Sequence, residues 1–252
     1  MKIEIEGCSL NYEILGEGAP ILLLHGWGAN IQAMRPIADC VARLGYSAVL
    51  FDFPGFGDSG ALDKPWTVDD YAHITRGFMG EINIYGCDVI GHSHGGRVAI
   101  RLASEDKALF DRLVLVDAAG IKPRRGVKYY AKVYSYKLGK RLSKVKWLDR
   151  LFSISKRQRS AGSEDYKALD SDAMRKTFVN LVNEDLRDCV KKIENETLLV
   201  WGSEDKDTPL YMARYMEKHI KNAGLALLDG AGHFSYADNY AQFCAVMKAF
   251  FG

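Results

Sequence analysis

Residues 85–96 read Tyr-Gly-Cys-Asp-Val-Ile-Gly-His-Ser-His-Gly-Gly, and this stretch decides the fold of the chain. It predicts a short apolar strand that runs into a Gly-x-Ser-x-Gly pattern around Ser93, with a helical stretch directly after it. This arrangement is typical of a nucleophile elbow, a sharp strand-to-helix turn that pushes a serine hydroxyl clear of the backbone. Gly91 and Gly95 leave room for the crossing chain, because a Cβ atom at either position would collide across so tight a turn. Five residues can match by chance, so the rest of the chain must support this interpretation.

Strands and helices alternate on both sides of this turn. An alternating pattern at residues 3–6 and 10–15, around Gly7, predicts an antiparallel hairpin. Continuous apolar runs, typical of strands buried on both faces, follow at residues 20–25, 47–52, 112–117, 197–202 and 225–229. Helical periodicity occupies residues 31–44, 67–83, 97–104 and 236–251, and Thr208-Pro209 forms an N-cap and first-turn pair for one more helix. The order of elements predicts an α/β fold with a mostly parallel, doubly wound sheet opened by an antiparallel hairpin.

Residues 121–195 interrupt this alternation. They show helical periodicity and no clear buried strand, so we expect a helical cap, or lid, inserted between two strands of the sheet. The core domain then comprises residues 1–120 and 196–252.

The overall composition excludes several classes of protein. At 252 residues and 48% hydrophobic content, the chain can bury one substantial core. Its net charge of +2 gives no general attraction to nucleic acid or to membranes. No segment approaches the roughly 18 apolar residues of a membrane-spanning helix, and the first residues lack the apolar segment of a signal peptide. We therefore expect a cytoplasmic protein without a nucleic-acid partner, and the sequence predicts no particular oligomeric state.

The cysteines and histidines give no sign of a disulfide framework or a metal site. The cysteines are odd in number and scattered, and we expect reduced thiols at Cys8, Cys40, Cys87, Cys189 and Cys244. His92 and His94 form a His-x-His pair, but no carboxylate or third histidine lies at ligand spacing. We therefore predict no metal at this pair.

A serine nucleophile needs partners elsewhere in the chain. Its hydroxyl needs a base to take its proton, and the base needs an acid to fix its tautomer and stabilise its charge. The candidate base is His233, in a glycine-containing loop after the last predicted strand. The candidate acid is Asp205, in the loop after the preceding strand. Because ligand sites in such sheets gather where the strands end, we expect Ser93, Asp205 and His233 to meet at one edge of the sheet.

The negative charge that develops on a substrate needs hydrogen-bond donors. One candidate is the backbone N–H of His94, which follows the serine at a helix N-terminus whose dipole favours negative charge. The other is the backbone N–H of Trp27, in the loop after the strand that ends at His25-Gly26. We therefore predict an oxyanion hole formed by Trp27 and His94.

Five motifs, in this order, resemble those of the α/β-hydrolase family. His25-Gly26 is similar to the oxyanion loop of the family, residues 52–59 to the loop after its fourth strand, residues 91–95 to its elbow, residues 201–205 to its acid turn and residues 230–233 to its histidine loop. The resemblance extends from one end of the chain to the other. It implies a cap between the sixth and seventh strands, where residues 121–195 lie, and it implies no cofactor and no metal.

Within this resemblance, three aspartates compete for one role. Asp205 stands in the acid turn, and Asp207 lies two residues beyond it. Asp117 ends the strand after which some members of the family place their acid. We predict Asp205 as the acid and leave Asp207 and Asp117 open as alternatives.

Four other polar residues are interpreted as structural. We expect His25 to bond the backbone near the oxyanion hole rather than to act as a catalyst. Asp52 and Asp58 are expected to hold their own loop together through local hydrogen bonds. His73 is most simply a helix residue that has found a partner.

The segment from Lys122 to Arg159 is strongly basic. It contains 14 of the 34 lysines and arginines and one acid, Asp149, which gives it a formal charge of about +13. Residues 126–142 interleave basic and apolar residues at helical spacing, which favours a cap helix with an apolar stripe at the mouth of the site and its lysines in water. Guidance of anionic substrates and contact with an anionic membrane surface are the two alternatives.

Together these residues predict a serine hydrolase that works through an acyl-enzyme. The first candidate is a carboxylesterase whose partner is a small-molecule ester with a small or medium acyl chain. A thioesterase or a C–C bond hydrolase on an anionic substrate is the alternative, and the cap residues Arg124, Arg125, Arg157 and Arg159 leave it open. A non-catalytic ligand-binding protein of the same fold is a remote alternative. The serine at position 93 argues against the haloalkane dehalogenase and epoxide hydrolase branches, which use aspartate there.

Overall fold

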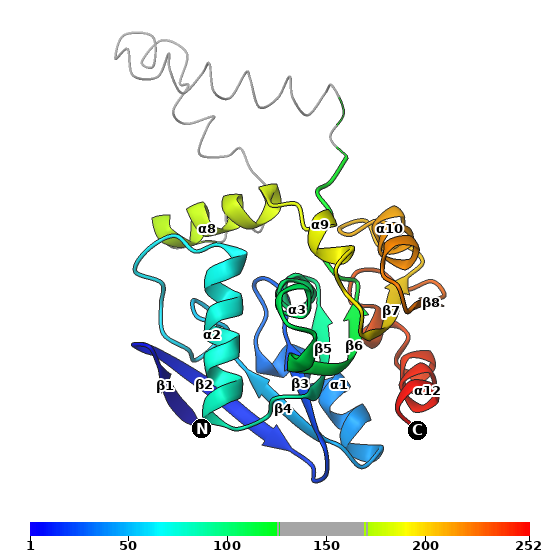
Figure 1. Cartoon of the computed structure of the whole chain (residues 1–252), viewed down its shortest axis with the longest axis horizontal. Coiled ribbons are helices and arrows are strands. Elements are labelled where there is room, and N and C mark those ends of the chain that lie inside the picture. Colours follow the sequence, from blue (N-terminus) through cyan, green and yellow to red (C-terminus); the bar gives the residue numbers. More distant parts are fainter. Residues whose placement is uncertain (125, 127–168, 170) are drawn as a thin grey trace.

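The structure is a computed structural model that describes residues 1–124, 126, 169 and 171–252. An eight-stranded sheet lies at its centre, in the order β1-β2-β4-β3-β5-β6-β7-β8 (Figure 1). The strands are β1 (Lys2–Ile5), β2 (Cys8–Leu15), β3 (Pro20–Leu24), β4 (Ser47–Phe51), β5 (Cys87–His92), β6 (Phe110–Val116), β7 (Glu196–Gly202) and β8 (Ala223–Leu228). The described helices are α1 (Ile31–Arg43), α2 (Val68–Glu81), α3 (His94–Glu105), α8 (Asp172–Asn183), α9 (Arg187–Val190), α10 (Tyr211–His219), α11 (Ser235–Asp238) and α12 (Tyr240–Phe251), with a 3-10 turn at Lys107–Leu109.

The sheet is parallel except at its first two strands. β4, β3, β5, β6, β7 and β8 pair in parallel, whereas β2 joins β4 and β1 joins β2 in antiparallel fashion. Glu6 and Gly7 form the turn between β1 and β2 with φ angles of 49° and 81°. Positive φ at both central residues is the signature of a type I′ turn, whose twist matches that of the strands it joins. The predicted mostly parallel sheet with an opening hairpin is therefore confirmed.

The interior strands are buried on both faces, as their continuous apolar sequences predict. Every residue of β5 is buried, and so are residues 21–24 of β3. α2 and α3 cover one face of the sheet, and α1 and α12 cover the other (Figure 1). Each layer encloses its own apolar core, with Phe51 and Tyr71 on one side and Val114 and Phe243 on the other. The sheet is thus held between two packed layers, which fixes the positions of the loops at its edge.

Two helix starts test the predicted caps. α2 begins with a capping box, since the Thr67 hydroxyl accepts from the N–H of Asp70 and the Asp70 carboxylate accepts from the N–H of Thr67 (2.7 Å). The prediction that Thr208 caps the next helix is wrong, because α10 begins only at Tyr211. The Thr208 hydroxyl instead lies 2.6 Å from Oδ2 of Asp205. A hydrogen bond to a carboxylate is stronger than one between neutral groups, and it draws this side chain into the acid loop.

Most of the predicted cap lies outside the described residues. The residues that the structure does not describe are 125, 127–168 and 170. They hold nearly all of the basic segment, so the alternative interpretations of that segment stay predictions. Within the described part, α8 and α9 are helical, as the periodicity predicts. Leu186 and Val190 are buried in the same core as α3, so the chain around α9 packs against that helix. The division into core and cap stays a prediction.

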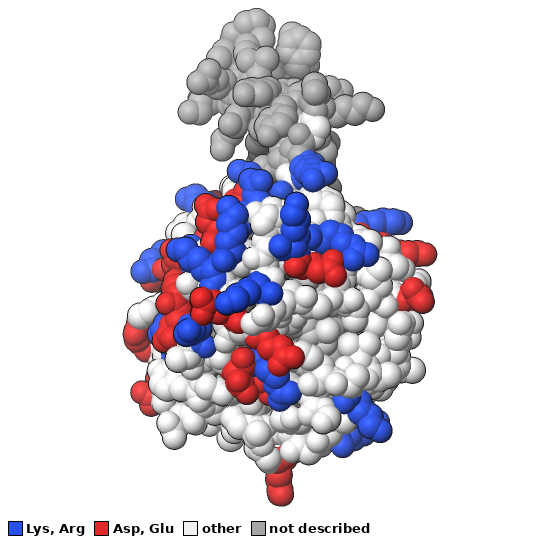
Figure 2. Space-filling model, turned by 45° about the vertical axis from the view of Figure 1, so that its right-hand side comes forward, with Lys and Arg blue, Asp and Glu red and all other residues white. Residues whose placement is uncertain are grey.

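Charges of both signs are interspersed on the surface. Figure 2 shows Lys and Arg side chains beside Asp and Glu side chains over the described part of one face. Pairs such as Lys191 with Asp188 (2.9 Å) are exposed, and exposed ion pairs contribute little to stability. Among the described helices, none combines the length and the apolar character needed to cross a membrane.

Candidate active site

Ser93 occupies a sharp turn between β5 and α3. β5 ends at His92, α3 begins at His94, and Ser93 between them has φ 50° and ψ −109°. Few residues other than glycine adopt this backbone conformation, so the surrounding structure must hold it. The Ser93 N–H donates to the carbonyl oxygen of Val116 (3.0 Å), and its own carbonyl oxygen accepts from the N–H of Ala119 (2.9 Å). The turn has the geometry of a nucleophile elbow.

Close backbone contacts require the glycines around this elbow. A Cβ atom on Gly91 would lie 2.7 Å from the backbone of Gly95, and one on Gly95 would lie 2.0 Å from the carbonyl oxygen of Leu24 in β3. These contacts confirm the steric prediction for both glycines. Gly96 is equally constrained, since a Cβ atom there would lie 2.4 Å from Cβ of Ala118. The first turn of α3 therefore packs on the sheet at backbone distance.

The structure brings Ser93, Asp205 and His233 together where their strands end. His233 follows β8, and its Nε2 lies 2.9 Å from Oγ of Ser93. Its Nδ1 lies 2.9 Å from Oδ2 of Asp205, which follows β7. Three loops that are far apart in sequence thus form one hydrogen-bonded chain from hydroxyl to imidazole to carboxylate, the arrangement that activates a serine.

The hydrogen bonds define where the protons lie. A carboxylate only accepts, so the Nδ1–H of His233 donates to Asp205 and leaves Nε2 to accept from the Ser93 hydroxyl. Burial would lower the pKa of His233, but the hydrogen bond to Asp205 and the charge of that carboxylate raise the pKa above 6.5. Burial would raise the pKa of Asp205, but hydrogen bonds from His233 and Thr208 lower it. Asp205 is therefore a carboxylate near neutral pH.

The Asp205 carboxylate is fixed by the loop that carries it. Its Oδ1 accepts from the backbone N–H groups of Asp207 (2.8 Å) and Thr208 (3.0 Å), while its Oδ2 lies 2.6 Å from the Thr208 hydroxyl. These contacts set the carboxylate plane so that Oδ2 also faces His233. The sequence predicts a different role for Thr208, since a threonine before proline is typical of a helix start. The Asp-x-x-Thr spacing is the signal that could have found the observed contact, because an aspartate often bonds the backbone two or three residues on.

Asp117 joins the two loops that carry Asp205 and His233. It lies directly after β6, is fully buried and has a positive φ of 44°. Its Oδ1 accepts from the N–H of Gly202 (2.8 Å), and its Oδ2 accepts from the N–H (3.1 Å) and the hydroxyl (2.5 Å) of Ser235. Burial raises the pKa of Asp117 to about 7, against the effect of these donors. Among the described residues, its carboxylate thus contacts the chain beside His233 and forms no hydrogen bond with the ring.

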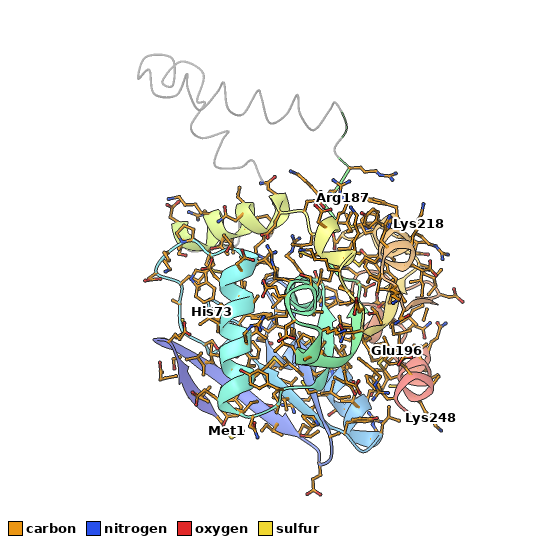
Figure 3. The ribbon with its side chains drawn as sticks, in the orientation of Figure 1. Met1, His73, Arg187, Glu196, Lys218 and Lys248 are labelled. Atoms are coloured by element: carbon orange, nitrogen blue, oxygen red, sulfur yellow. The ribbon has the colours of Figure 1, made fainter. Side chains whose placement is uncertain are left out.

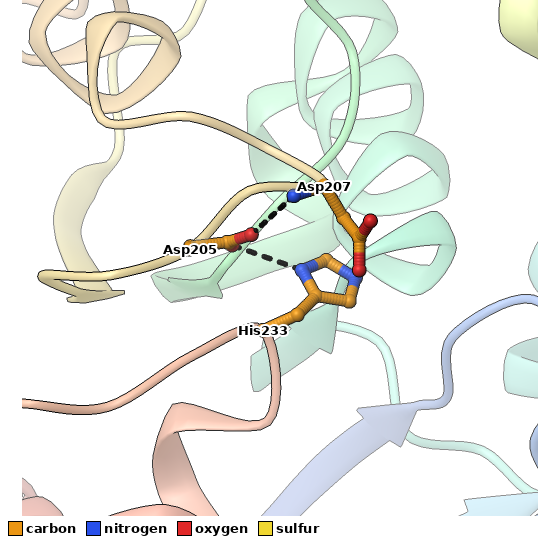
Figure 4. A group of neighbouring side chains, drawn as sticks. All are labelled: Asp205, Asp207 and His233. Carbon is orange, nitrogen blue, oxygen red and sulfur yellow. Dashed lines mark hydrogen bonds and ion pairs between the residues drawn. The ribbon is translucent and has the colours of Figure 1, made fainter.

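Asp207, the other alternative acid, lies beside the His233 ring (Figure 4). Its backbone N–H donates to Asp205, but within the described residues no hydrogen bond joins its exposed carboxylate to either ring nitrogen. The possible ligand atoms of Asp205, Asp207 and His233 lie within 4.8 Å of one another, which is close enough to hold a metal ion. Asp205 and His233 already bond each other, however, so a metal ion there would break the chain to Ser93. The absence of a metal site stays a prediction.

The loop after β3 passes across the elbow. A Cβ atom on Gly26 would lie 2.9 Å from Nδ1 of His92 and 3.3 Å from Cβ of Ser93, so this loop lies against the serine. Trp27 follows in the loop, and His94 begins α3. No hydrogen bond joins the backbone N–H of either residue to another described group. Both predicted oxyanion donors therefore stand near Ser93 with their N–H groups unused by the described chain.

His25 and Asp52 hold the loops around the elbow through hydrogen bonds, as predicted. The Nδ1–H of His25 donates to the carbonyl oxygen of Gly26 (2.7 Å), and its Nε2 accepts from the N–H of Phe53 (2.9 Å). Burial lowers the pKa of His25 to about 4, which keeps the ring neutral. Asp52 accepts from the backbone N–H of Asp58 in its own loop (3.0 Å).

His92 and His73 also have partners. Nε2 of His92 donates to the carbonyl oxygen of His233 (2.8 Å), so β5 holds the histidine loop directly. Burial lowers the pKa of His92 to about 3 and keeps this ring neutral. His73, labelled on α2 in Figure 3, has its Nε2 2.7 Å from a carboxylate oxygen of Glu6 in the hairpin turn. The partner expected for His73 is confirmed, and it comes from a turn that lies 67 residues away in sequence.

Comparisons with known proteins agree with this fold. The model of the alpha/beta hydrolase family matches residues 21–246. The AB hydrolase superfamily protein YisY of Bacillus subtilis is 25% identical over 267 residues, which cover 97% of this chain and 96% of that protein. An esterase from Exiguobacterium antarcticum has a TM-score of 0.77 and 22% identity, covering 99% of this chain and 98% of its own. A meta-cleavage product hydrolase from Pseudomonas fluorescens has a TM-score of 0.74 and 22% identity, covering 100% and 97%.

The chain therefore belongs to the alpha/beta hydrolase family. The family match includes the oxyanion loop, the elbow, the acid loop and the histidine loop. The two solved structures, at their low identity, show that the fold is shared.

The contact between Gly95 and Leu24 generates a prediction about stability. Gly95→Ala places a Cβ atom 2.0 Å from a carbonyl oxygen, so α3 must shift away from the sheet. We expect a loss of about 1–3 kcal/mol in the free energy of unfolding, measured by urea denaturation. Gly224→Ala is the matched control, since nothing lies within 4 Å of a Cβ atom there. Equal stability of the two variants would contradict the packing described for α3.

The raised pKa of His233 generates a prediction about pH. Ser93 can transfer its proton only to a neutral ring, so kcat/KM should rise with pH as His233 deprotonates, with a midpoint above 6.5. Asp205→Asn removes the charge that raises this pKa, so the midpoint should move to lower pH as the rate falls. The profile is measured from about pH 5 to about pH 9. A midpoint that stays unchanged in the Asp205 variant would speak against the coupling of the two groups.

Proposed function

We propose that this protein is a serine hydrolase that works through an acyl-enzyme and cleaves carboxylic esters with small or medium acyl chains. The observation that carries this proposal is the hydrogen-bonded chain from Ser93 through His233 to Asp205, which begins on a strained elbow. A serine hydroxyl bonded to a neutral imidazole is an activated nucleophile. Membership of a hydrolase family supports the same class of chemistry.

In the first half of the proposed reaction, Oγ of Ser93 attacks the ester carbonyl carbon and its proton passes to Nε2 of His233. The imidazolium that results is stabilised by Asp205, 2.9 Å from Nδ1. The backbone N–H groups of Trp27 and His94 bind the oxyanion, where the dipole of α3 also favours negative charge. His233 then gives its proton to the leaving alcohol, and Ser93 is left acylated.

In the second half, water releases the acyl group. His233 takes a proton from the water, whose oxygen attacks the carbonyl carbon of the acyl-enzyme. The same two N–H groups bind the second oxyanion. As the bond to Ser93 breaks, the proton returns from His233 to the serine oxygen and the carboxylic acid leaves. Each proton is accounted for by these residues, so the proposal includes no cofactor.

The choice of esters draws on the described relatives. The similar protein from Exiguobacterium antarcticum is described as an esterase, whereas the one from Pseudomonas fluorescens is described as a meta-cleavage product hydrolase. The two activities differ in the bond that is broken. We expect the highest kcat/KM on p-nitrophenyl esters, compared with acyl thioesters and with a meta-cleavage C–C substrate. A higher value on either of the other substrates would replace the ester assignment.

Removal of the nucleophile tests the reaction class. A fluorophosphonate probe should label the wild-type protein and fail to label Ser93→Ala, and ester turnover should fall by about 10⁵-fold or more. Ser104→Ala is the matched control, because Ser104 lies further along α3 and bonds only a carbonyl of its own helix within the described chain. Failure of the probe to label folded wild-type protein would overturn the proposal.

Two aspartate variants separate the competing acids. Asp205→Asn should lower kcat by about 10⁴-fold, because an amide no longer fixes the tautomer of His233. Asp207→Asn should lower kcat by less than about ten-fold, because an exposed charge is screened by water and salt. Both variants are compared by steady-state kinetics after circular dichroism shows that they are folded. The opposite order of effects would transfer the acid role to Asp207.

A further inference from the structure

The indole of Trp27 is held between aromatic rings from three other segments. Its centroid lies 4.8 Å from that of Phe56 in the loop after β4, 5.9 Å from that of His94 in α3 and 5.3 Å from that of Phe178 in α8. Phe178 comes from the segment between β6 and β7, far from Trp27 in sequence. One residue of α8 thus completes the packing around a residue of the oxyanion loop.

The loop that carries Trp27 has glycine on both sides of it. Gly26 precedes Trp27, and Gly28 follows it with a φ of 71°. The carbonyl oxygen of Gly26 accepts from the N–H of Ala29 (3.2 Å) and from Nδ1–H of His25 (2.7 Å). This carbonyl belongs to the same peptide plane as the N–H of Trp27, so the two hydrogen bonds hold one end of that plane. The indole stands on the Cα atom at the other end, and its packing holds that end.

Hydrogen bonds to Trp66 fix the part of α8 that presents Phe178. The hydroxyl of Thr177, one residue before Phe178, accepts from the backbone N–H of Trp66 (2.8 Å). The amide of Asn180, two residues after Phe178, donates to the carbonyl oxygen of Trp66 (3.0 Å). Thr177 is fully buried, and buried hydrogen bonds of this kind hold an element in place. The Phe178 ring therefore meets the indole from a fixed backbone.

We propose that Phe178 is a positioning residue for the oxyanion hole: its ring holds the indole of Trp27 and, through it, the backbone N–H that binds the oxyanion. This inference rests on the proposed esterase function. The loop lies against the nucleophile, since a Cβ atom on Gly26 would lie 3.3 Å from Cβ of Ser93. A small shift of the loop therefore changes the distance from this N–H to an oxyanion that forms only during the reaction. Phe178 thus controls the rate of the chemical step more than the binding of the ester.

The first test compares kcat and KM of wild type, Phe178→Ala, Phe178→Leu and Val179→Ala on p-nitrophenyl acetate and butanoate. Loss of the ring should lower kcat by about 10-fold or more and change KM by less than about three-fold, because a displaced donor weakens binding of the transition state alone. Leucine keeps apolar bulk against the indole and should restore part of kcat. Val179→Ala is the matched control, since this side chain is 45% exposed on the same helix and should leave both constants unchanged.

The two acyl chains separate a positioning role from direct contact with the substrate. Acetate and butanoate esters place the same carbonyl group in the oxyanion hole, so Phe178→Ala should lower kcat by the same factor on both. Direct packing of Phe178 on the acyl chain would give a larger loss in kcat/KM on the butanoate. A loss that grows with chain length therefore overturns the inference.

A double-mutant cycle tests whether Phe178 acts through Trp27. Trp27→Ala removes the indole and keeps the backbone N–H, so adding Phe178→Ala in that background should lower kcat by less than about two-fold. Circular dichroism checks that each variant is folded, and where an alanine variant does not fold, leucine at the same position serves for the same comparison.

The remaining outcomes separate this inference from the proposed function. Effects that multiply in the double variant, or an unchanged kcat in Phe178→Ala, overturn the inference and leave the esterase proposal standing. Absence of both ester turnover and fluorophosphonate labelling in folded wild-type protein overturns the proposed function and this inference with it.

Discussion

The close approach of α3 to β3, where Gly95 lies against the carbonyl oxygen of Leu24, is the constraint on which the site depends. It allows the helix to begin directly at the edge of the sheet, and the chain can reach that position only through the unusual backbone angles at Ser93. The strain at one residue is offset by hydrogen bonds from β6 and by the packing of α3. As a result, the Ser93 hydroxyl and the positive end of the α3 dipole lie at the same edge of the sheet.

Ser93, Asp205 and His233 come from separate loops, and buried hydrogen bonds tie these loops to the sheet. His92 bonds the carbonyl oxygen of His233 from the strand that carries the serine. Asp117, directly after the neighbouring strand β6, bonds Gly202 at the end of β7 and Ser235 beyond His233. Buried hydrogen bonds of this kind hold the loops in fixed positions relative to the strands. The alignment of the Ser93 hydroxyl, the His233 ring and the Asp205 carboxylate therefore depends on hydrogen bonds from His92 in β5 and from Asp117 after β6.

Features that depend on local sequence patterns could be predicted from the sequence. Contacts between segments that are far apart in the chain became visible only in the structure. Periodicity and turn residues predict the sheet, the hairpin and the elbow, and the order of the motifs predicts which loops meet. The local context of Thr208 favours a helix cap, whereas its hydroxyl bonds the Asp205 carboxylate. The ring of His94 packs against Trp27 and Phe53, in the loops after β3 and β4, and against Tyr71 of α2. No spacing rule within one segment reveals such packing.

The hydrogen bonds of Asp117 limit which carboxylate can pair with the ring of His233. Its two oxygens already serve the N–H of Gly202 and both polar groups of Ser235. To reach the histidine ring, the carboxylate would have to release one of these partners, and a buried N–H or hydroxyl would lose its acceptor. Relocating the acid to β6 would thus need compensating substitutions in two other loops. The hydrogen bonds that Asp117 already makes therefore favour a partner for the His233 ring after β7, where Asp205 lies.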